Sequence, residues 1–250
     1  TLLKRLRGLM EREKVDLVIL VDFYGFNIRL AETAKKLGLP VFYYVSPQVW
    51  ASRENRVDKI KKFVDKVLCL FPFEEDFYRE RGMRAKFVGH PLVSLLKSAH
   101  TTNGGAQKHS GFQIGLMPGS RPGEIKRHWG VLQKIWKIVK ADFPNAEGVL
   151  YQRPDLKPES YPSKKELASW DIRAEYGPAY PSRARLDLAI TCSGMATLEN
   201  MMMGVPQIVF YGVKPWWFFP IIRKLARTPY IAMPNVLAKK RWVPETAWVM

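Results

Sequence analysis

Two short glycine-containing turns carry the residues with the clearest chemical potential. The first is PGSR at residues 118–121, which follows an apolar run and precedes a helical pattern. Gly119 would let backbone N–H groups, including that of Ser120, approach an anion at a helix N-terminus. Arg121 would add a planar, bidentate phosphate donor. The turn does not fit the P-loop pattern. It predicts a phosphate site, and the alternative is an ordinary strand-to-helix turn with a solvated arginine.

The second turn, Ser193-Gly194, belongs to a later strand-and-helix unit. Ser193 is a plausible helix N-cap, and Gly194 permits close approach of the backbone to a ligand. Glu199 lies four residues after Met195, on the helix face that carries the turn. A carboxylate at that position can accept hydrogen bonds from a vicinal diol such as a ribose. The alternative is a glutamate that faces solvent.

Asp22 and His90 each end an apolar run and are candidates for acid–base chemistry. Asp22 could act as a general base, or it could simply cap a turn or a helix. His90 precedes Pro91, and we expect a structural role there. The chain has no serine–histidine–aspartate set and no metal-ligand spacing, and its two cysteines form no C-x-x-C pair. Neither a metal nor a cofactor is predicted.

Short apolar runs that alternate with helical patterns predict parallel sheet built from βαβ units. The runs lie at residues 15–21, 41–47, 66–72, 86–91, 112–117 and 186–192. We therefore predict an α/β chain of two Rossmann-like, doubly wound domains at 1–97 and 112–250, joined by a linker at 98–111. No element is predicted with any clarity in 153–183, which is rich in proline and charge.

The 250 residues carry a net charge of +17, which favours an anionic partner: a nucleic acid, an anionic membrane or a phosphorylated substrate. No window approaches the ~18 apolar residues of a spanning helix. The segment KPWWFFPIIRKLAR at 214–227 places Trp216, Trp217, Phe218 and Phe219 between basic residues. It is either core beside a basic surface or an interfacial segment that contacts acyl chains and anionic headgroups.

Several ordered motifs resemble those of the bacterial lipid-A-disaccharide synthase family, whose members are glycosyltransferases of the two-Rossmann-domain (GT-B) class. The motifs are DFYGFNIRLA, YYVSPQVWA, LFPFEEDFY, KFVGHPL, LMPGSR, CSGMATLE and KPWWFF…MPNVLA…WVPE. The resemblance implies transfer of 2,3-diacylglucosamine from UDP-2,3-diacylglucosamine to 2,3-diacylglucosamine 1-phosphate, giving the β-1,6-linked disaccharide 1-phosphate and UDP. It also implies a peripheral enzyme at the cytoplasmic face of the bacterial inner membrane, with no metal and no nucleic-acid partner.

The resemblance assigns roles to particular residues. Asp22 matches the family's proposed general base, and Arg121 matches an arginine at the donor diphosphate. Ser193, Gly194 and Glu199 match the nucleotide-binding turn, with Glu199 on the ribose, and Asn235 matches an asparagine near the nucleotide. With Gly119 and Ser120, these residues form the predicted donor site.

The chain also departs from the family pattern. Met195 stands where the family often has threonine, which removes a hydroxyl near the phosphates. By the resemblance, we expect the N-terminal domain to be incomplete and the C-terminal helices to be missing. An unpaired sheet edge would then leave the isolated piece poorly active or insoluble. Two alternatives stay open, namely another UDP-sugar transferase of the GT-B class with a lipid-linked acceptor and a non-enzymatic, basic nucleic-acid-binding protein.

Overall fold

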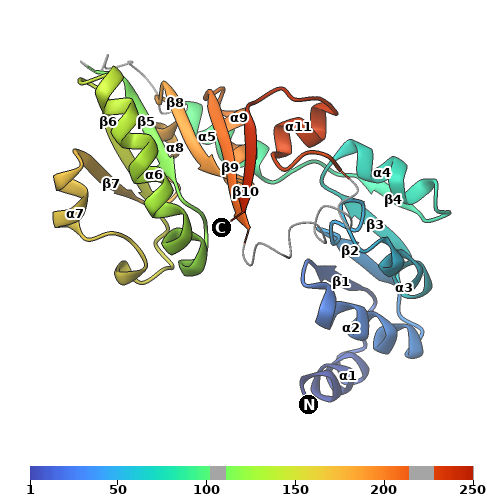
Figure 1. The fold of residues 1–250 in the computed structure, drawn as a ribbon. Coiled ribbons are helices and arrows are strands. Elements are labelled where there is room, and N and C mark those ends of the chain that lie inside the picture. Colours follow the sequence, from blue (N-terminus) through green and yellow to red (C-terminus); the bar gives the residue numbers. More distant parts are fainter. Residues whose placement is uncertain (102–110, 214–227, 250) are drawn as a thin grey trace. The chain divides into compact units, whose positions relative to one another are not determined.

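The structure is a computed structural model that describes residues 1–101, 111–213 and 228–249 (Figure 1). Residues Thr1–Pro91 form one compact unit, and the described residues from Leu92 onward form a second. The aromatic segment at 216–219, predicted to contact lipid, lies outside the described residues.

The first unit is built on a four-stranded parallel sheet in the order β1-β2-β3-β4. The strands are β1 (Val18–Val21), β2 (Val41–Tyr44), β3 (Lys66–Cys69) and β4 (Ala85–Phe87). The helices are α1 (Leu2–Arg12), α2 (Tyr24–Lys36), α3 (Val57–Phe63) and α4 (Pro72–Arg79), and a 3-10 turn spans Glu54–Arg56. Buried apolar side chains of β1, β2 and β3 pack with those of α2 and α3 in one core.

The start of α4 shows how sequence sets a local element in this unit. Pro72 occupies the first turn, where its missing N–H costs nothing. Glu74 reaches back to accept hydrogen bonds from the backbone N–H groups of Leu70 and Phe71, at 3.0 and 3.1 Å. The same carboxylate accepts the indole N–H of Trp50 at 2.9 Å. Burial raises the pKa of Glu74, and these three donors oppose that rise.

The second unit holds a six-stranded parallel sheet in the order β10-β9-β8-β5-β6-β7. Its strands are β5 (Gln113–Met117), β6 (Glu147–Gln152), β7 (Ile172–Tyr176), β8 (Leu188–Cys192), β9 (Gln207–Val213) and β10 (Glu245–Val249). Its helices are α5 (Leu92–Thr101), α6 (Pro122–Asp142), α7 (Lys164–Ser169), α8 (Tyr180–Arg183), α9 (Met195–Met202) and α11 (Met233–Ala238), with a 3-10 turn at Pro158–Ser160. When the strands of this unit are counted along the chain, β5 is the first and β10 is the sixth. From β7, their order across the sheet is then 3-2-1-4-5-6, which is the doubly wound order of a Rossmann fold.

Helix α6 covers β5 and β6, whereas α5, α8 and α9 lie behind the sheet in Figure 1. One face of α6 is apolar and packs onto the sheet: Ile125, Trp129, Leu132 and Trp136 are buried in the core of this unit. The indole N–H of Trp136 also donates to the carbonyl of Trp170 at 2.6 Å. Fully burying one such large apolar side chain contributes about 1.5–3 kcal/mol, so the stripe anchors the helix that follows the PGSR turn.

The boundary between the units differs from the prediction. Helix α5 covers residues that the sequence assigned partly to the first domain and partly to the linker at 98–111. It contacts α8 and α9, and Leu92 and Leu96 are buried, so the second unit begins at Leu92. The polar run after residue 97 hid the end of this helix. The stretch 153–183, where no element was predicted, contains α7, β7 and α8.

Candidate functional site

In the second sheet, β6 and β7 lie on one side of β5, and β8, β9 and β10 lie on the other, so the strand order switches between β5 and β8. The two glycine turns follow these two strands. The strands are neighbours, with Leu116 opposite Ile190 and Met117 opposite Thr191. The PGSR turn and Ser193-Gly194 therefore leave the same edge of the sheet side by side. In doubly wound sheets, ligands bind at this switch point, beyond the carboxyl ends of the strands.

A cavity of about 520 Å³ opens at this edge. Gly119, Ser120, Ser193, Gly194 and Glu199, all predicted from the sequence, contribute to its wall. The other lining residues come from the ends of the strands, from the loops after β6 and β7, and from helices α8 and α9: Met117, Tyr151, Gln152, Arg153, Pro154, Asp155, Gly177, Pro178, Arg183, Cys192, Met195 and Ala196. The turns that precede α6 and α9 meet at this cavity, and each helix directs the positive end of its dipole toward this edge of the sheet.

Glu124 organises the PGSR turn, and the sequence reading missed it. Its carboxylate accepts the backbone N–H of Ser120 at 2.9 Å and a guanidinium N–H of Arg121 at 3.1 Å. Gly119 has a φ of +134°, and an added Cβ would lie 2.8 Å from the Cβ of Glu124. Glycine is therefore required here by close approach as well as by conformation. The sequence feature that could have identified Glu124 is its place in the first turn of the helix, two residues after the proline that opens α6.

Arg121 lies beside the cavity and is absent from its wall. Its side chain is 79% exposed and pairs with Glu124 at the N-terminus of α6. An exposed guanidinium of this kind can turn toward an incoming anion at little cost, because surface ion pairs contribute only about 0–1 kcal/mol. The structure thus keeps Arg121 adjacent to the predicted phosphate site.

Ser193 does not cap α9, so that prediction is wrong. The N-cap is Gly194, and the hydroxyl of Ser193 donates to the carbonyl of Ile231. Thr197 donates its hydroxyl to the carbonyl of Gly194 at 2.8 Å, which supports the turn from inside the helix. The turn itself lines the cavity, and Ser193 also links it to the segment before α11.

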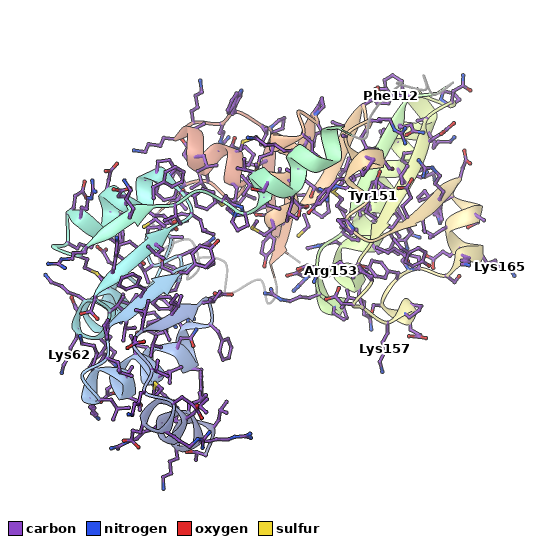
Figure 2. All side chains as sticks on the ribbon, turned by 180° about the vertical axis from the view of Figure 1, so that it is seen from behind. Lys62, Phe112, Tyr151, Arg153, Lys157 and Lys165 are labelled. Carbon is purple, nitrogen blue, oxygen red and sulfur yellow. The ribbon has the colours of Figure 1, made fainter. Side chains whose placement is uncertain are left out.

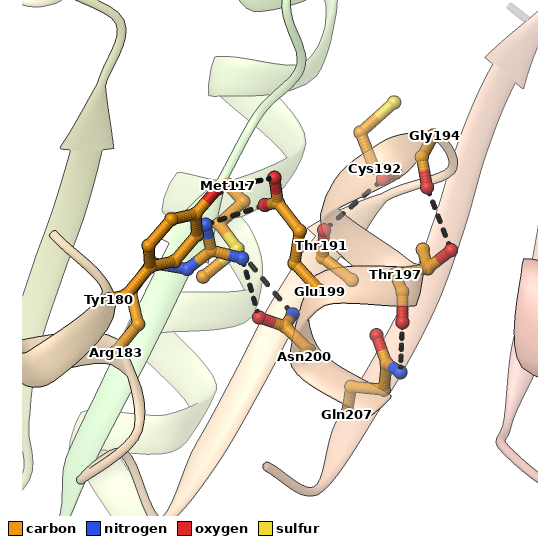
Figure 3. A network of polar contacts seen from close by, with 10 residues as sticks. All are labelled: Met117, Tyr180, Arg183, Thr191, Cys192, Gly194, Thr197, Glu199, Asn200 and Gln207. Carbon is orange, nitrogen blue, oxygen red and sulfur yellow. Dashed lines mark hydrogen bonds and ion pairs between the residues drawn. The ribbon is translucent and has the colours of Figure 1, made fainter. Parts of the chain in front are cut away.

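Glu199 does not face solvent, which rules out the alternative considered for it. Its side chain is 17% exposed, and its Oε2 accepts a guanidinium N–H of Arg183 at 2.7 Å. Its Oε1 accepts the hydroxyl of Tyr180 at 3.2 Å. Figure 3 shows the two side chains reaching this carboxylate from the same side, with Asn200 below it. Arg183 and Tyr180 come from α8, in the stretch that the sequence reading could not place.

His128, a buried residue of α6, makes a hydrogen bond to the first residue of the PGSR turn. Its buried ring accepts the backbone N–H of Gly212 at Nε2, 3.2 Å away, so the ring proton lies on Nδ1 and is donated to the carbonyl of Pro118 at 2.6 Å. Burial is the main cause that lowers the pKa of His128. One neutral imidazole therefore joins the end of β9 to the start of the predicted phosphate turn.

Asn235 and the two cysteines are buried in the fold. Asn235 is fully buried in α11 and uses its side chain to bind the backbone of Trp242 and Val243, away from the cavity wall. Cys69 and Cys192 are free, buried thiols, and burial raises the pKa of each to about 12. Across the described ranges, no cluster of histidine, cysteine and carboxylate side chains could hold a metal ion.

Asp22 belongs to the first unit and is not among the residues that line this cavity. Its side chain is exposed, and its backbone has a φ of +49°, an uncommon value for a residue other than glycine. Its carbonyl accepts the amide N–H of Asn27 at 2.6 Å and the hydroxyl of Tyr43 at 2.8 Å. These buried side chains hold the strained end of β1. His90 packs its half-buried ring against Phe71, with ring centroids 5.4 Å apart.

Residues 1–248 match the family model for lipid-A-disaccharide synthetase. The chain belongs to this family. Two lipid-A-disaccharide synthase relatives are those of Syntrophus aciditrophicus, 36% identical over 252 residues, and of Myxococcus xanthus, 38% identical over 253 residues. Each comparison covers 98% of this chain and 65% of the relative, so the chain spans about 65% of the length of these synthases. The resemblance found in the motifs is confirmed.

Solved structures confirm the fold class of this synthetase-family chain. Staphylococcus aureus MnaA, determined with UDP, matches with a TM-score of 0.61 at 11% identity, over 95% of this chain and 69% of that one. The UDP-GlcNAc 2-epimerase of Methanocaldococcus jannaschii matches with a TM-score of 0.58 at 12% identity, over 99% of this chain and 70% of that one. At such identities the likeness is one of fold, and it agrees with the predicted pair of Rossmann-like α/β domains.

Proposed function

We propose that the protein containing this chain transfers 2,3-diacylglucosamine from UDP-2,3-diacylglucosamine to 2,3-diacylglucosamine 1-phosphate, forming the β-1,6-linked lipid A disaccharide 1-phosphate and UDP. One observation carries the proposal. Gly119 and Ser120 of one predicted turn, and Ser193, Gly194 and Glu199 of the other, line a single cavity at the switch point of a doubly wound sheet, in a chain of the lipid-A-disaccharide synthetase family.

The cavity suits a nucleoside diphosphate. The diphosphate would lie between the N-termini of α6 and α9, where Gly119 and Gly194 let the backbone approach and both helix dipoles favour negative charge. Arg121 would exchange its carboxylate partner, Glu124, for the more highly charged phosphates. Glu199 would accept the hydroxyls of the ribose.

The reaction then needs a base and a stabilised leaving group. Asp22 would accept the proton of the acceptor's 6-hydroxyl group while the oxygen of that hydroxyl attacks the anomeric carbon of the donor. The bond from that carbon to the β-phosphate oxygen breaks, and UDP departs with the electron pair. Arg121 and the helix N–H groups would stabilise the developing charge on UDP.

Peripheral binding at the cytoplasmic face of the bacterial inner membrane is part of the proposal. The net charge of +17 would draw the protein to anionic lipid headgroups, and Trp216, Trp217, Phe218 and Phe219 would contact acyl chains. No helix in the described part of the chain is long and apolar enough to cross a bilayer. In Figure 2, Lys62 projects from the first unit, and Lys157 and Lys165 project from the second. The basic residues are spread along the sequence instead of forming one run, which argues against a nucleic-acid-binding module.

Binding and turnover of the full-length protein test the proposal together. We expect saturable UDP binding that weakens at least about tenfold in Arg121→Ala, because charge-assisted hydrogen bonds to phosphate are lost. Arg185→Ala, an exposed arginine outside the cavity wall, is the matched control and should bind UDP normally. Tight, steeply salt-dependent binding to duplex DNA without UDP affinity would support the nucleic-acid alternative instead. Product with only a lipid-linked muropeptide acceptor would support the other transferase.

A further inference from the structure

Arg183 is a buried cation in the cavity wall that neither the motifs nor the proposed reaction requires. It ends α8, and its side chain is 6% exposed. One terminal nitrogen donates to Glu199 Oε2 at 2.7 Å, and the other donates to Asn200 Oδ1 at 2.8 Å. In Figure 3 the guanidinium therefore bridges two consecutive residues of α9.

Structural stability alone gives little reason to place an arginine here. Removing a guanidinium from water costs several kcal/mol, and well-packed apolar replacements of buried ion pairs are often equally stable. The fold also leaves the Nε of Arg183 without a hydrogen-bond partner within the described residues, although the atom is buried. The two terminal nitrogens, by contrast, make short and well-directed contacts. The feature that this arginine secures is the position of the Glu199 carboxylate.

The hydrogen-bonding capacity of Glu199 matches a pair of hydroxyl groups. A carboxylate has about four acceptor sites. Arg183 occupies one site on Oε2, and Tyr180 occupies one site on Oε1. One site then remains on each oxygen, and Glu199 lines the cavity. Because both oxygens are held from the α8 side, the carboxylate cannot rotate freely about its last bond.

We infer that Arg183 is a positioning residue that holds Glu199 so that both of its oxygens recognise a vicinal diol, which makes the site selective for ribonucleotides over 2′-deoxyribonucleotides. The inference rests on the proposed function, since it takes the cavity as a nucleoside-diphosphate site. Arg183 acts through Glu199 and need not touch the ligand itself.

The experiment compares two probes, UDP and 2′-deoxy-UDP, by calorimetric titration of the full-length protein. The wild type should prefer UDP. In Arg183→Met, UDP affinity should fall about tenfold, the loss of one well-directed hydrogen bond to a charged group, while 2′-deoxy-UDP affinity changes less than about twofold. Arg183→Lys keeps the charge but supplies one nitrogen instead of two, so it should recover part of the selectivity. Arg185→Met, two residues away and exposed, should keep the wild-type ratio.

Each failure has its own signature. A wild-type protein that does not bind UDP overturns the proposed function. A wild type that binds both probes equally overturns the role of Glu199 as the diol acceptor. If the wild type is selective and Arg183→Met keeps the wild-type ratio of UDP to 2′-deoxy-UDP affinity, the inference about Arg183 is wrong. If Arg183→Met does not fold, the same ratio in Arg183→Lys and in the wild type overturns the inference. Circular dichroism of each variant establishes folding before titration.

Discussion

Replacing His128 with phenylalanine should weaken the second unit at the point where the PGSR turn meets the end of β9. Phenylalanine keeps the edge-on ring contact with Phe210, whose centroid lies 5.2 Å away. It removes both hydrogen bonds, which leaves the carbonyl of Pro118 and the N–H of Gly212 buried and unpaired. Each unmade buried hydrogen bond costs about 1–3 kcal/mol, so the free energy of unfolding of this unit should fall by about 2–6 kcal/mol.

The same residue should make the stability of this unit depend on pH. Burial and the charge of Arg127 lower the pKa of His128, while the Pro118 carbonyl, Glu124 and Gly212 oppose the shift. The folded-state pKa therefore lies below the ordinary value of 6.5. The stabilisation is fully present above the unfolded-state pKa and is lost as the pH falls, because the unfolded chain takes up the proton first. From pH 7.5 to pH 5.5 the loss should reach at most about 1.4 kcal/mol.

Hydrogen exchange followed by mass spectrometry in increasing urea separates the two units, because peptides of α6 and β9 report the second unit and peptides of α2 and α3 report the first. His128→Phe should lower protection in the second unit only, and should flatten its pH dependence. His128→Gln keeps a donor and an acceptor without titrating, so it should lose less stability while showing the same flattening. His90→Gln, in the first unit, is the control. Equal pH dependence in wild type and His128→Phe would refute the reasoning.

Three further substitutions address the turns and the strained end of β1. Gly119→Ala should weaken UDP binding about tenfold, since its Cβ would lie 2.8 Å from the Cβ of Glu124 and the strain is of order 1–3 kcal/mol; wild-type affinity in titration would contradict this. Asn27→Ala removes two hydrogen bonds, to Val21 and Asp22, and should destabilise the first unit in urea by about 1–3 kcal/mol, whereas an unchanged midpoint would mean that the turn holds itself. Met195, 48% exposed in the cavity wall, should tighten UDP binding about two- to tenfold when changed to threonine; no change would assign the contact to backbone N–H groups.

Local sequence patterns determined the elements and much of the candidate site. Apolar runs at 112–117 and 186–192 correspond to β5 and β8, and the helical spacing of Trp129 and Trp136 marks the face of α6 that packs on the sheet. Burial on both sides of a parallel strand leaves a continuous apolar signature, and a helix leaves a 3.6-residue period. Because ligands gather where such strands end, Gly119 and Gly194 could be proposed from sequence alone.

Tertiary structure decided which polar groups each of these residues meets. Glu124, four residues after Ser120, was within reach of a local rule, but the partners of Glu199 come from α8, 16 and 19 residues earlier in the chain. Ser193 bonds to Ile231, 38 residues away, instead of capping its own helix. Propensity and periodicity describe neighbours along the chain, whereas the choice of a buried hydrogen-bond partner depends on which segments the packed sheet brings together. The sequence thus determined where a ligand could bind, and the fold determined how the binding groups are held.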